Sequence, residues 1–174
     1  VRNGRSTDVP EADLRQGYDT NLLGVHLTAN AAARAMMAAG SRESEAGRIV
    51  IIGSITAQMT GQGDAAYAAS KGGMLAMHKS IARAYASENI LSFAITPGFT
   101  DTAMAGDYLD SRGGPGLLAD IPLGRVAEPE EIAKLIEFCA LDAPPSMTGR
   151  LICWRDISSR FSRMIVVDLT SRPD

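Results

Sequence analysis

The stretch that decides the fold is Arg48-Ile-Val-Ile-Ile-Gly-Ser54, an unbroken apolar run that ends in glycine and serine. β-Branched residues without alternation are typical of a parallel strand that is buried on both faces of its sheet. A helical pattern follows over about residues 66–88, and a second apolar run, Ile90-Leu-Ser-Phe-Ala-Ile95, comes next. Strand, helix and strand in this order predict a parallel α/β sheet, because parallel neighbours need a crossover helix.

Helical patterns flank this strand–helix–strand unit on both sides. Pro10 suits the first turn of a helix, and the pattern that begins there continues over residues 10–39. Residues 22–39 are apolar on most sides, which predicts burial between layers or at a contact between subunits. A further helix begins near Pro129, with two glutamates in its first turn.

Two segments are predicted to be loops, and the end of the chain is unusual. Residues 41–47 are polar, and residues 99–127 are rich in loop signals, with Gly113-Gly-Pro-Gly116 as a mobile tip. Residues 150–154 and 164–167 are two candidate strands, although one strand is enough to finish a sheet of this type. We therefore expect a domain over residues 1–149 followed by an atypical tail over residues 150–174.

The composition is that of an ordinary globular chain. Its 174 residues are enough for one domain with a core, and 45% of them are hydrophobic and 21% charged. A net charge of −3 attracts neither nucleic acid nor anionic lipid, and no apolar run approaches the roughly 20 residues that span a bilayer. Cys139 and Cys153 match no metal or disulfide pattern, so we expect no metal site and a reduced, cytoplasmic setting.

Three polar residues lie after the first strand and at the start of the next helix. Ser54 follows the strand directly, and Tyr67 and Lys71 are four residues apart, on one face of the helix. A phenol beside a fixed cation is a tuned proton donor and acceptor, because the cation stabilises the phenolate. Ligands of open α/β sheets gather at the carboxyl ends of the strands, where Ser54 can hydrogen-bond a carbonyl oxygen. This layout predicts a site for interconverting a carbonyl and an alcohol.

Such a reaction moves a hydride as well as a proton. No side chain donates hydride, so a nicotinamide cofactor, NAD or NADP, is implied. The proton donor has to lie within hydrogen-bond reach of the carbonyl oxygen, and Tyr67 is the candidate for that role. The sequence therefore predicts an oxidoreductase that acts on a small carbonyl or alcohol substrate.

An ordered set of motifs carries a resemblance to a known family. The chain resembles the short-chain dehydrogenases/reductases, and within them the 3-oxoacyl-acyl-carrier-protein reductases, over about residues 10–149. The matching pieces, in the family's order and at its usual separations, are Asp19-Thr-Asn21-Leu-Leu-Gly24, Gly53-Ser54, Tyr67-Ala-Ala-Ser-Lys71, Pro97-Gly98-Phe-Thr-Asp-Thr102, Leu123-Gly-Arg125 and Glu128-Pro-Glu-Glu131. Tyr-x-x-x-Lys alone is a weak signal, whereas the ordered set is a strong one.

The resemblance implies a role for each of these site residues. Tyr67 would be the catalytic acid and base, Lys71 would also bind the nicotinamide ribose, and Ser54 would orient the substrate oxygen. Asn21 would anchor a water in a proton relay to Lys71. The segment from Thr102 to about Leu118 would form a substrate lid. The residues that would line the nicotinamide are Pro97, Gly98, Thr100 and Thr102.

Each residue also has a structural interpretation when it is taken alone. Asn21 in a helix is ordinarily a packing or surface residue, Ser54 a strand-end hydroxyl, and Lys71 a solvated lysine. The two histidines, His26 and His78, belong to no serine-elbow or metal-ligand pattern and are expected to be structural or surface residues.

The chain departs from the family in what precedes these motifs. The sequence contains no T-G-x-x-x-G-x-G turn, which receives the cofactor pyrophosphate at a helix N-terminus, and no Asn-Asn-Ala-Gly segment. We therefore expect the C-terminal part of a Rossmann-like, doubly wound parallel sheet with flanking helices, N-terminally truncated and without its first βαβ units. Residues 1–174 alone are expected to bind NAD(P)H poorly and to turn over slowly.

Three interpretations remain open at this point. The first is a family oxidoreductase, with the homodimer or homotetramer that is usual in the family. The second is a truncated, non-catalytic oligomerisation or binding module whose contact surface is formed by the apolar helices 22–39 and 66–88. The third, a sugar-nucleotide epimerase or dehydratase, uses the same tyrosine and lysine on a longer chain and needs a larger C-terminal substrate domain than residues 150–174 offer.

Overall fold

The computed structural model describes residues 5–45, 47–61, 63–110, 114–121 and 123–153. Within these ranges the chain forms a parallel, three-stranded sheet in the order β1-β2-β3. The strands are β1 (Gly47–Ile52), β2 (Ile90–Thr96) and β3 (Leu151–Cys153). The register pairs Gly47 with Ile90 and Ala94 with Leu151. The predicted parallel α/β sheet is therefore confirmed, and the first candidate strand of the tail is β3.

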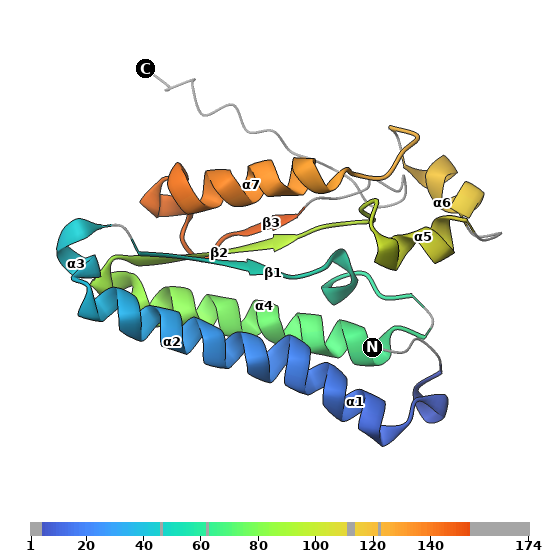
Figure 1. Ribbon diagram of the computed structural model, residues 1–174, viewed down its shortest axis with the longest axis horizontal. Coiled ribbons are helices and arrows are strands. Elements are labelled where there is room, and N and C mark those ends of the chain that lie inside the picture. The colour runs from blue at the N-terminus through green and yellow to red at the C-terminus, as the bar shows by residue number, and fades with distance from the viewer. Residues whose placement is uncertain (1–4, 46, 62, 111–113, 122, 154–174) are drawn as a thin grey trace, which may run out of the picture.

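Helices cover both faces of the sheet (Figure 1). On one face lie α1 (Glu11–Tyr18), the π-helical η2 (Asp19–Gly24) and α2 (Val25–Ala38), which run on without a break, together with α4 (Ala65–Tyr85). On the opposite face lies α7 (Pro129–Leu141). The remaining elements are short: η1 (Ser6–Asp8), α3 (Ser41–Ser44), η3 (Ile55–Ala57), η4 (Ala86–Glu88), α5 (Ala103–Leu109), α6 (Gly114–Asp120) and η5 (Pro145–Met147).

Two apolar clusters form the core, one on each face of the sheet. The first joins α2, β1 and α4 through buried residues that include Ala33, Ile51 and Met74. The second joins β2 to α7 through Phe93 and Cys139, both fully buried. Because β2 lies between the other two strands, all seven of its residues are buried. The sheet is thus packed on both of its faces.

The prediction of two loops was wrong in part. Within residues 99–127, which were predicted to be a loop, α5 and α6 pack against each other, and the expected glycine-rich tip opens α6. Pro115 suits that first turn, and tertiary contact stabilises helices too short to be read from periodicity. Within residues 41–47, α3 forms because Ser41 is buried and its hydroxyl donates to the Glu88 carbonyl at 2.8 Å.

The glycine pair in α4 has one close neighbour. A Cβ added at Gly73 would lie 3.1 Å from Leu22 Cδ1, whereas one at Gly72 would meet only the Ala57 carbonyl, at 4.0 Å. Gly73 therefore lets the π-helical segment η2 approach the backbone of α4. This contact brings the two segments that carry the candidate catalytic residues side by side.

Candidate active site

The ends of β1 and β2 lie next to each other. The Gly53 N–H donates to the Ile95 carbonyl at 2.7 Å, and the Ile55 N–H donates to the Pro97 carbonyl at 3.0 Å. The segment Gly53-Ser54 is therefore bonded directly to the β2 end that leads into Pro97-Gly98. As expected for an open parallel sheet, the polar strand-end motifs share its carboxyl edge.

Ser54 keeps a donor available at this edge. It is extended, with φ −161° and ψ 150°, and it caps η3 by accepting the Thr56 N–H on its Oγ at 3.2 Å. A serine hydroxyl has one donor and two acceptor positions. Accepting this bond leaves the Ser54 O–H able to donate to an oxygen placed beside it. The side chain is half-buried, so a small molecule can reach it.

Tyr67 and Lys71 lie together in the first turns of α4. The Lys71 Nζ is 5.7 Å from the centroid of the Tyr67 ring. The two side chains therefore lie side by side on one face of the helix, as predicted from their spacing in the sequence. Both side chains are half-buried. Burial lowers the pKa of the Lys71 ammonium from its ordinary value. A desolvated ammonium interacts more strongly with nearby acceptors than a solvated one.

Lys71 also bonds the backbone of β1. Its Nζ donates to the Ile52 carbonyl at 3.1 Å. A trans peptide holds its C=O and N–H on opposite sides, and the Gly53 N–H points to β2. The Ile52 carbonyl therefore points away from β2, to the edge of β1 that has no partner strand among the described residues.

Asn21 reaches the same helix through Ser70, a residue that the sequence reasoning did not single out. The Asn21 Nδ2 donates to Ser70 Oγ at 3.2 Å, and Ser70 Oγ donates to the Tyr67 carbonyl at 2.8 Å. Ser70 is fully buried. These two bonds connect the π-helical segment η2 to the turn of α4 that carries Tyr67 and Lys71. The signal for Ser70 was its place inside Tyr67-Ala-Ala-Ser-Lys71.

The segment after β2 carries two threonine hydroxyls whose hydrogen bonds are long. Thr100 Oγ1 and Thr102 Oγ1 donate to the carbonyls of Gly98 and Thr100, both at a long 3.4 Å. A carboxamide can both donate to and accept from hydroxyls and backbone, so the Thr100 and Thr102 hydroxyls are of a kind that can pair with an amide-bearing ring.

Comparison with known proteins identifies the family of the chain. The family model described as "Enoyl-(Acyl carrier protein) reductase" matches residues 1–154. The chain belongs to the short-chain dehydrogenase/reductase family. This family of oxidoreductases uses NAD or NADP. The predictions of the family, of the α/β fold and of NAD or NADP as the family's cofactor are therefore confirmed.

Curated members of this family are similar over most of the chain. The 3-oxoacyl-(acyl-carrier-protein) reductase FabG of Salmonella typhimurium is 37% identical over 134 residues, which are 77% of this chain and 52% of the relative. The FabG of Escherichia coli K12 matches to the same extent, and that of Pseudomonas aeruginosa is 36% identical. The chain therefore spans about half the length of the curated relatives it matches.

Solved structures of similar proteins support the same assignment. A proposed NAD(P)-dependent gluconate 5-dehydrogenase from Beutenbergia cavernae, solved with bound NADP at low occupancy, has a TM-score of 0.80 and 28% identity, and the match covers 88% of this chain and 60% of that one. A proposed gluconate dehydrogenase from Agrobacterium tumefaciens has a TM-score of 0.79 and 26% identity, covering 87% and 58%. Among the described residues of our short-chain dehydrogenase/reductase chain, no helix is long and apolar enough to cross a membrane.

Proposed function

We propose that this chain carries the catalytic side chains of an NAD(P)-dependent oxidoreductase that interconverts a carbonyl and a secondary alcohol. The observation that supports it best is the placement of the Lys71 ammonium over the Tyr67 ring, beside the strand end that carries Ser54. The names of the curated relatives suggest a 3-oxoacyl thioester as substrate. We keep the cytoplasm as the proposed location, on the sequence grounds given above.

In this proposal Tyr67 moves the proton and its neighbours prepare it. Ser54 donates its free O–H to the substrate oxygen and so orients the carbonyl. Tyr67 gives its phenolic proton to that oxygen in reduction and takes it back in oxidation. Lys71, whose burial strengthens its field, stabilises the phenolate that forms between these steps. Asn21 keeps the turn that carries both residues in place through Ser70.

The cofactor supplies the hydride when it is bound. Lys71 would hold its ribose hydroxyls, and the residues that would line its nicotinamide are Pro97, Gly98, Thr100 and Thr102. The chain contains the residues proposed for the nicotinamide half of the cofactor site, but its sequence contains no glycine-rich phosphate turn. We therefore expect the dissociation constant of residues 1–174 for NADPH to lie above the micromolar range.

Turnover by the unaltered chain and by Tyr67→Phe tests the proposal. We expect NADPH-dependent reduction of a 3-oxoacyl thioester to be slow in the unaltered chain and at least about a hundredfold slower in Tyr67→Phe, because no other group supplies the proton. Tyr85→Phe is the matched control, since it removes the same hydroxyl from the far end of α4, where Tyr85 packs on the core. Equal rates in the unaltered chain and Tyr67→Phe would contradict the proposal.

A second candidate function is favoured by the surface of α2. Leu23 and Leu27, in η2 and α2, are 51% and 58% exposed, which is unusual for leucines in neighbouring turns of one helical face. A module that assembles through this face, with no turnover, is the alternative. Tyr67→Phe separates the two functions, because it removes turnover in the first and leaves self-association unchanged in both.

A further inference from the structure

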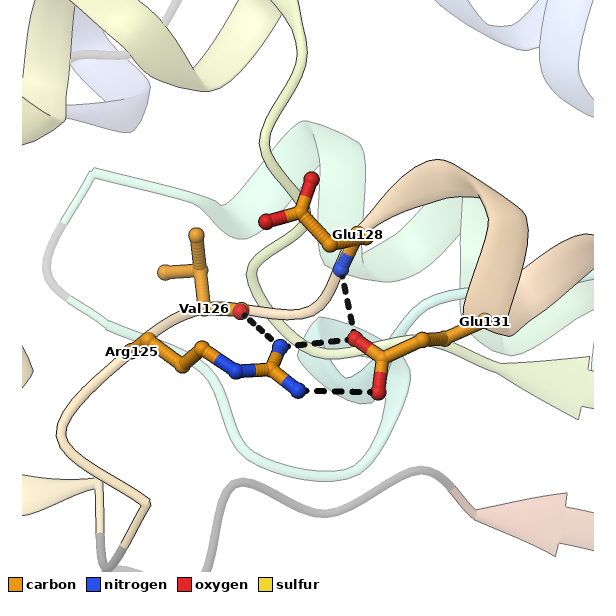
Figure 2. A network of polar contacts seen from close by, with 4 residues as sticks. All are labelled: Arg125, Val126, Glu128 and Glu131. Carbon is orange, nitrogen blue, oxygen red and sulfur yellow. Dashed lines mark hydrogen bonds and ion pairs between the residues drawn. The ribbon is translucent and has the colours of Figure 1, made fainter.

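One motif of the sequence has no role in the proposed chemistry. Leu123-Gly-Arg125 and Glu128-Pro-Glu-Glu131 follow the segment predicted to be a lid and extend into the first turn of α7, away from Tyr67 in the chain. They lie where the backbone enters α7, and Arg125 and Glu131 face each other there (Figure 2). The question is what this pair holds in place.

Glu131 has several partners at once. Arg125 donates through Nη1 to Glu131 Oε2 at 2.7 Å and through Nη2 to Oε1 at 3.1 Å, a two-pronged ion pair. Glu131 Oε2 also accepts the Glu128 N–H at 2.8 Å, as half of the capping box of α7. The same Nη1 of Arg125 donates to the Val126 carbonyl at 3.0 Å. Figure 2 shows the bonds from Arg125 and Glu128 converging on the Glu131 carboxylate, while Arg125 also reaches the Val126 carbonyl. The short segment from Arg125 to Glu128 is thereby tied to the first turn of α7.

The tied segment pairs with the strand-end loop of β2. Thr100 and Ala127 form a parallel β-bridge outside the main sheet. The Asp101 N–H donates to the Ala127 carbonyl at 2.8 Å, and the Ala127 N–H donates to the Phe99 carbonyl at 3.1 Å. Val126 and Ala127 are buried, although Arg125 and Glu128 on either side of them are exposed. Phe99–Asp101 therefore depends on a segment that Arg125 and Glu131 anchor.

We propose that the Arg125–Glu131 pair is a positioning clamp, which fixes Val126-Ala127 against Phe99–Asp101 and so sets the shape of the loop that faces the nicotinamide. The first half of this proposal concerns the chain alone, and the second half rests on the proposed function. Arg125 and Glu131 touch no reacting atom in this scheme. They act through the β-bridge on Thr100 and its neighbours, and rigid placement of such a loop is what cofactor orientation requires.

The geometry selects a substitution that removes the pair and little else. Glu131→Gln keeps an oxygen for the Glu128 N–H, so the capping box survives, but it loses the charge that the guanidinium binds in two places. Glu130→Gln is the matched control, because Glu130 is exposed, lies in the same turn and makes none of these bonds in the described part of the chain. Arg125→Gln removes the other partner of the ion pair. It measures the effect of losing the pair if Glu131→Gln fails to fold.

Amide hydrogen exchange of the full chain is the decisive measurement. In Glu131→Gln we expect the amides of Asp101 and Ala127 to exchange about tenfold faster, because the bridge that protects them opens locally. The Ala94 amide, which donates to the Arg150 carbonyl elsewhere in the sheet, should keep its rate. Glu130→Gln should leave all three rates unchanged. Unchanged rates at Asp101 and Ala127 in both Glu131→Gln and Arg125→Gln would overturn the clamp.

Binding of reduced nicotinamide mononucleotide, followed by its fluorescence, tests the second half. This probe has no adenosine part and only one phosphate, so its binding depends less on a glycine-rich phosphate turn than the binding of NADPH does. We expect its dissociation constant to rise about fivefold in Glu131→Gln and to stay the same in Glu130→Gln. Faster exchange with unchanged affinity would overturn the positioning role. Faster exchange in a chain that does not bind the probe even unaltered would support the clamp and contradict the proposed function.

Discussion

Ser70 links the two segments that carry the candidate catalytic residues, η2 with Asn21 and the first turns of α4 with Tyr67. It is fully buried and uses its hydroxyl twice, accepting from Asn21 and donating to the Tyr67 carbonyl. Replacing it by alanine leaves the Asn21 amide without this acceptor at a half-buried position. An unsatisfied group of this kind costs about 1–3 kcal/mol.

We expect Ser70→Ala to lower the free energy of unfolding by about that amount, roughly 1–3 kcal/mol, in a urea titration. Ser80→Ala, the same change at an exposed position of α4, should stay within about 0.5 kcal/mol of the unaltered chain. Asn21→Ala in the Ser70→Ala background should cost less than it does alone, because the bond is already lost. Additive effects of the two substitutions would contradict the described link.

Glu131 makes the stability of the chain depend on pH in acid. The hydrogen bonds from Arg125, then the Glu128 N–H, hold the pKa of Glu131 at about 2, below its ordinary 4.5, and Lys134 acts in the same direction. Because the folded-state pKa is the lower one, the stabilisation is fully present above about pH 4.5 and is lost as the pH falls towards 2.

We therefore expect the urea midpoint of the unaltered chain to fall more steeply between pH 5 and pH 2.5, a window that follows from the Glu131 pKa, than that of Glu131→Gln. Other carboxylates titrate in this window as well, so the difference between the two curves carries the information. Glu130→Gln should follow the unaltered chain. Parallel curves for all three proteins would show that the ion pair contributes nothing in solution.

At the scale of elements, the contact between η2 and α4 depends on Gly73, which has a hydrogen atom where alanine would have a methyl group. Gly72 and Gly73 are adjacent in α4, and alanine is better than glycine in a helix interior by about 1 kcal/mol. A Cβ at Gly72 has room, whereas one at Gly73 meets two methyl groups of Leu22, at 3.1 and 3.2 Å. The pair thus separates helix propensity from packing in one measurement.

We expect Gly72→Ala to raise the free energy of unfolding by about 0.5–1 kcal/mol, and Gly73→Ala to be less stable than Gly72→Ala. Thermal denaturation followed by circular dichroism gives both values. In a Leu22→Ala background the two substitutions should become alike, because the obstructing side chain is gone. A persistent difference in that background would place the cause elsewhere than in Leu22.

At the scale of the whole molecule, exposed apolar side chains lie on the helices of both faces of the sheet. The exposed face defined by Leu23 and Leu27 lies on the helix pair that covers β1, whereas Leu141, 67% exposed, ends α7 on the other side (Figure 1). We expect the chain to self-associate through the first face, as a homodimer or homotetramer. A charge placed in a buried apolar contact disrupts it, because the charge would lose its water.

Sedimentation velocity tests this surface. Leu27→Glu should shift the chain towards the monomer, and Leu141→Glu, the same substitution on the opposite face, should leave the distribution unchanged. Equal effects of the two substitutions would mean that the contact is not on α2. A monomeric unaltered chain at the highest concentration measured would contradict self-association altogether.

The sequence predicted what depends on local pattern, and it missed what depends on distant partners. The β-branched runs identified β1 and β2, and the spacing of Tyr67 and Lys71 predicted their shared face correctly. Helices α5 and α6 were missed because contact with each other, rather than periodicity, defines them. The bridge between Thr100 and Ala127 joins residues that no local rule connects. The roles of the site residues and the domain boundary after residue 149 stay predictions, and residues 164–167 lie outside the described residues.

The bond from Lys71 to the Ile52 carbonyl has a thermodynamic consequence. The carbonyl lies on the edge of β1 that has no partner strand in the part of the chain that the structure describes, and the ammonium is also the group proposed to hold the ribose. A strand that docks on that edge would take over the carbonyl and release the ammonium. Two ligands that share one intermediary change each other's affinity by the same factor. We therefore expect edge pairing and the proposed nucleotide binding to be reciprocally coupled through the Lys71 side chain, so that the occupancy of either site can be read from the other.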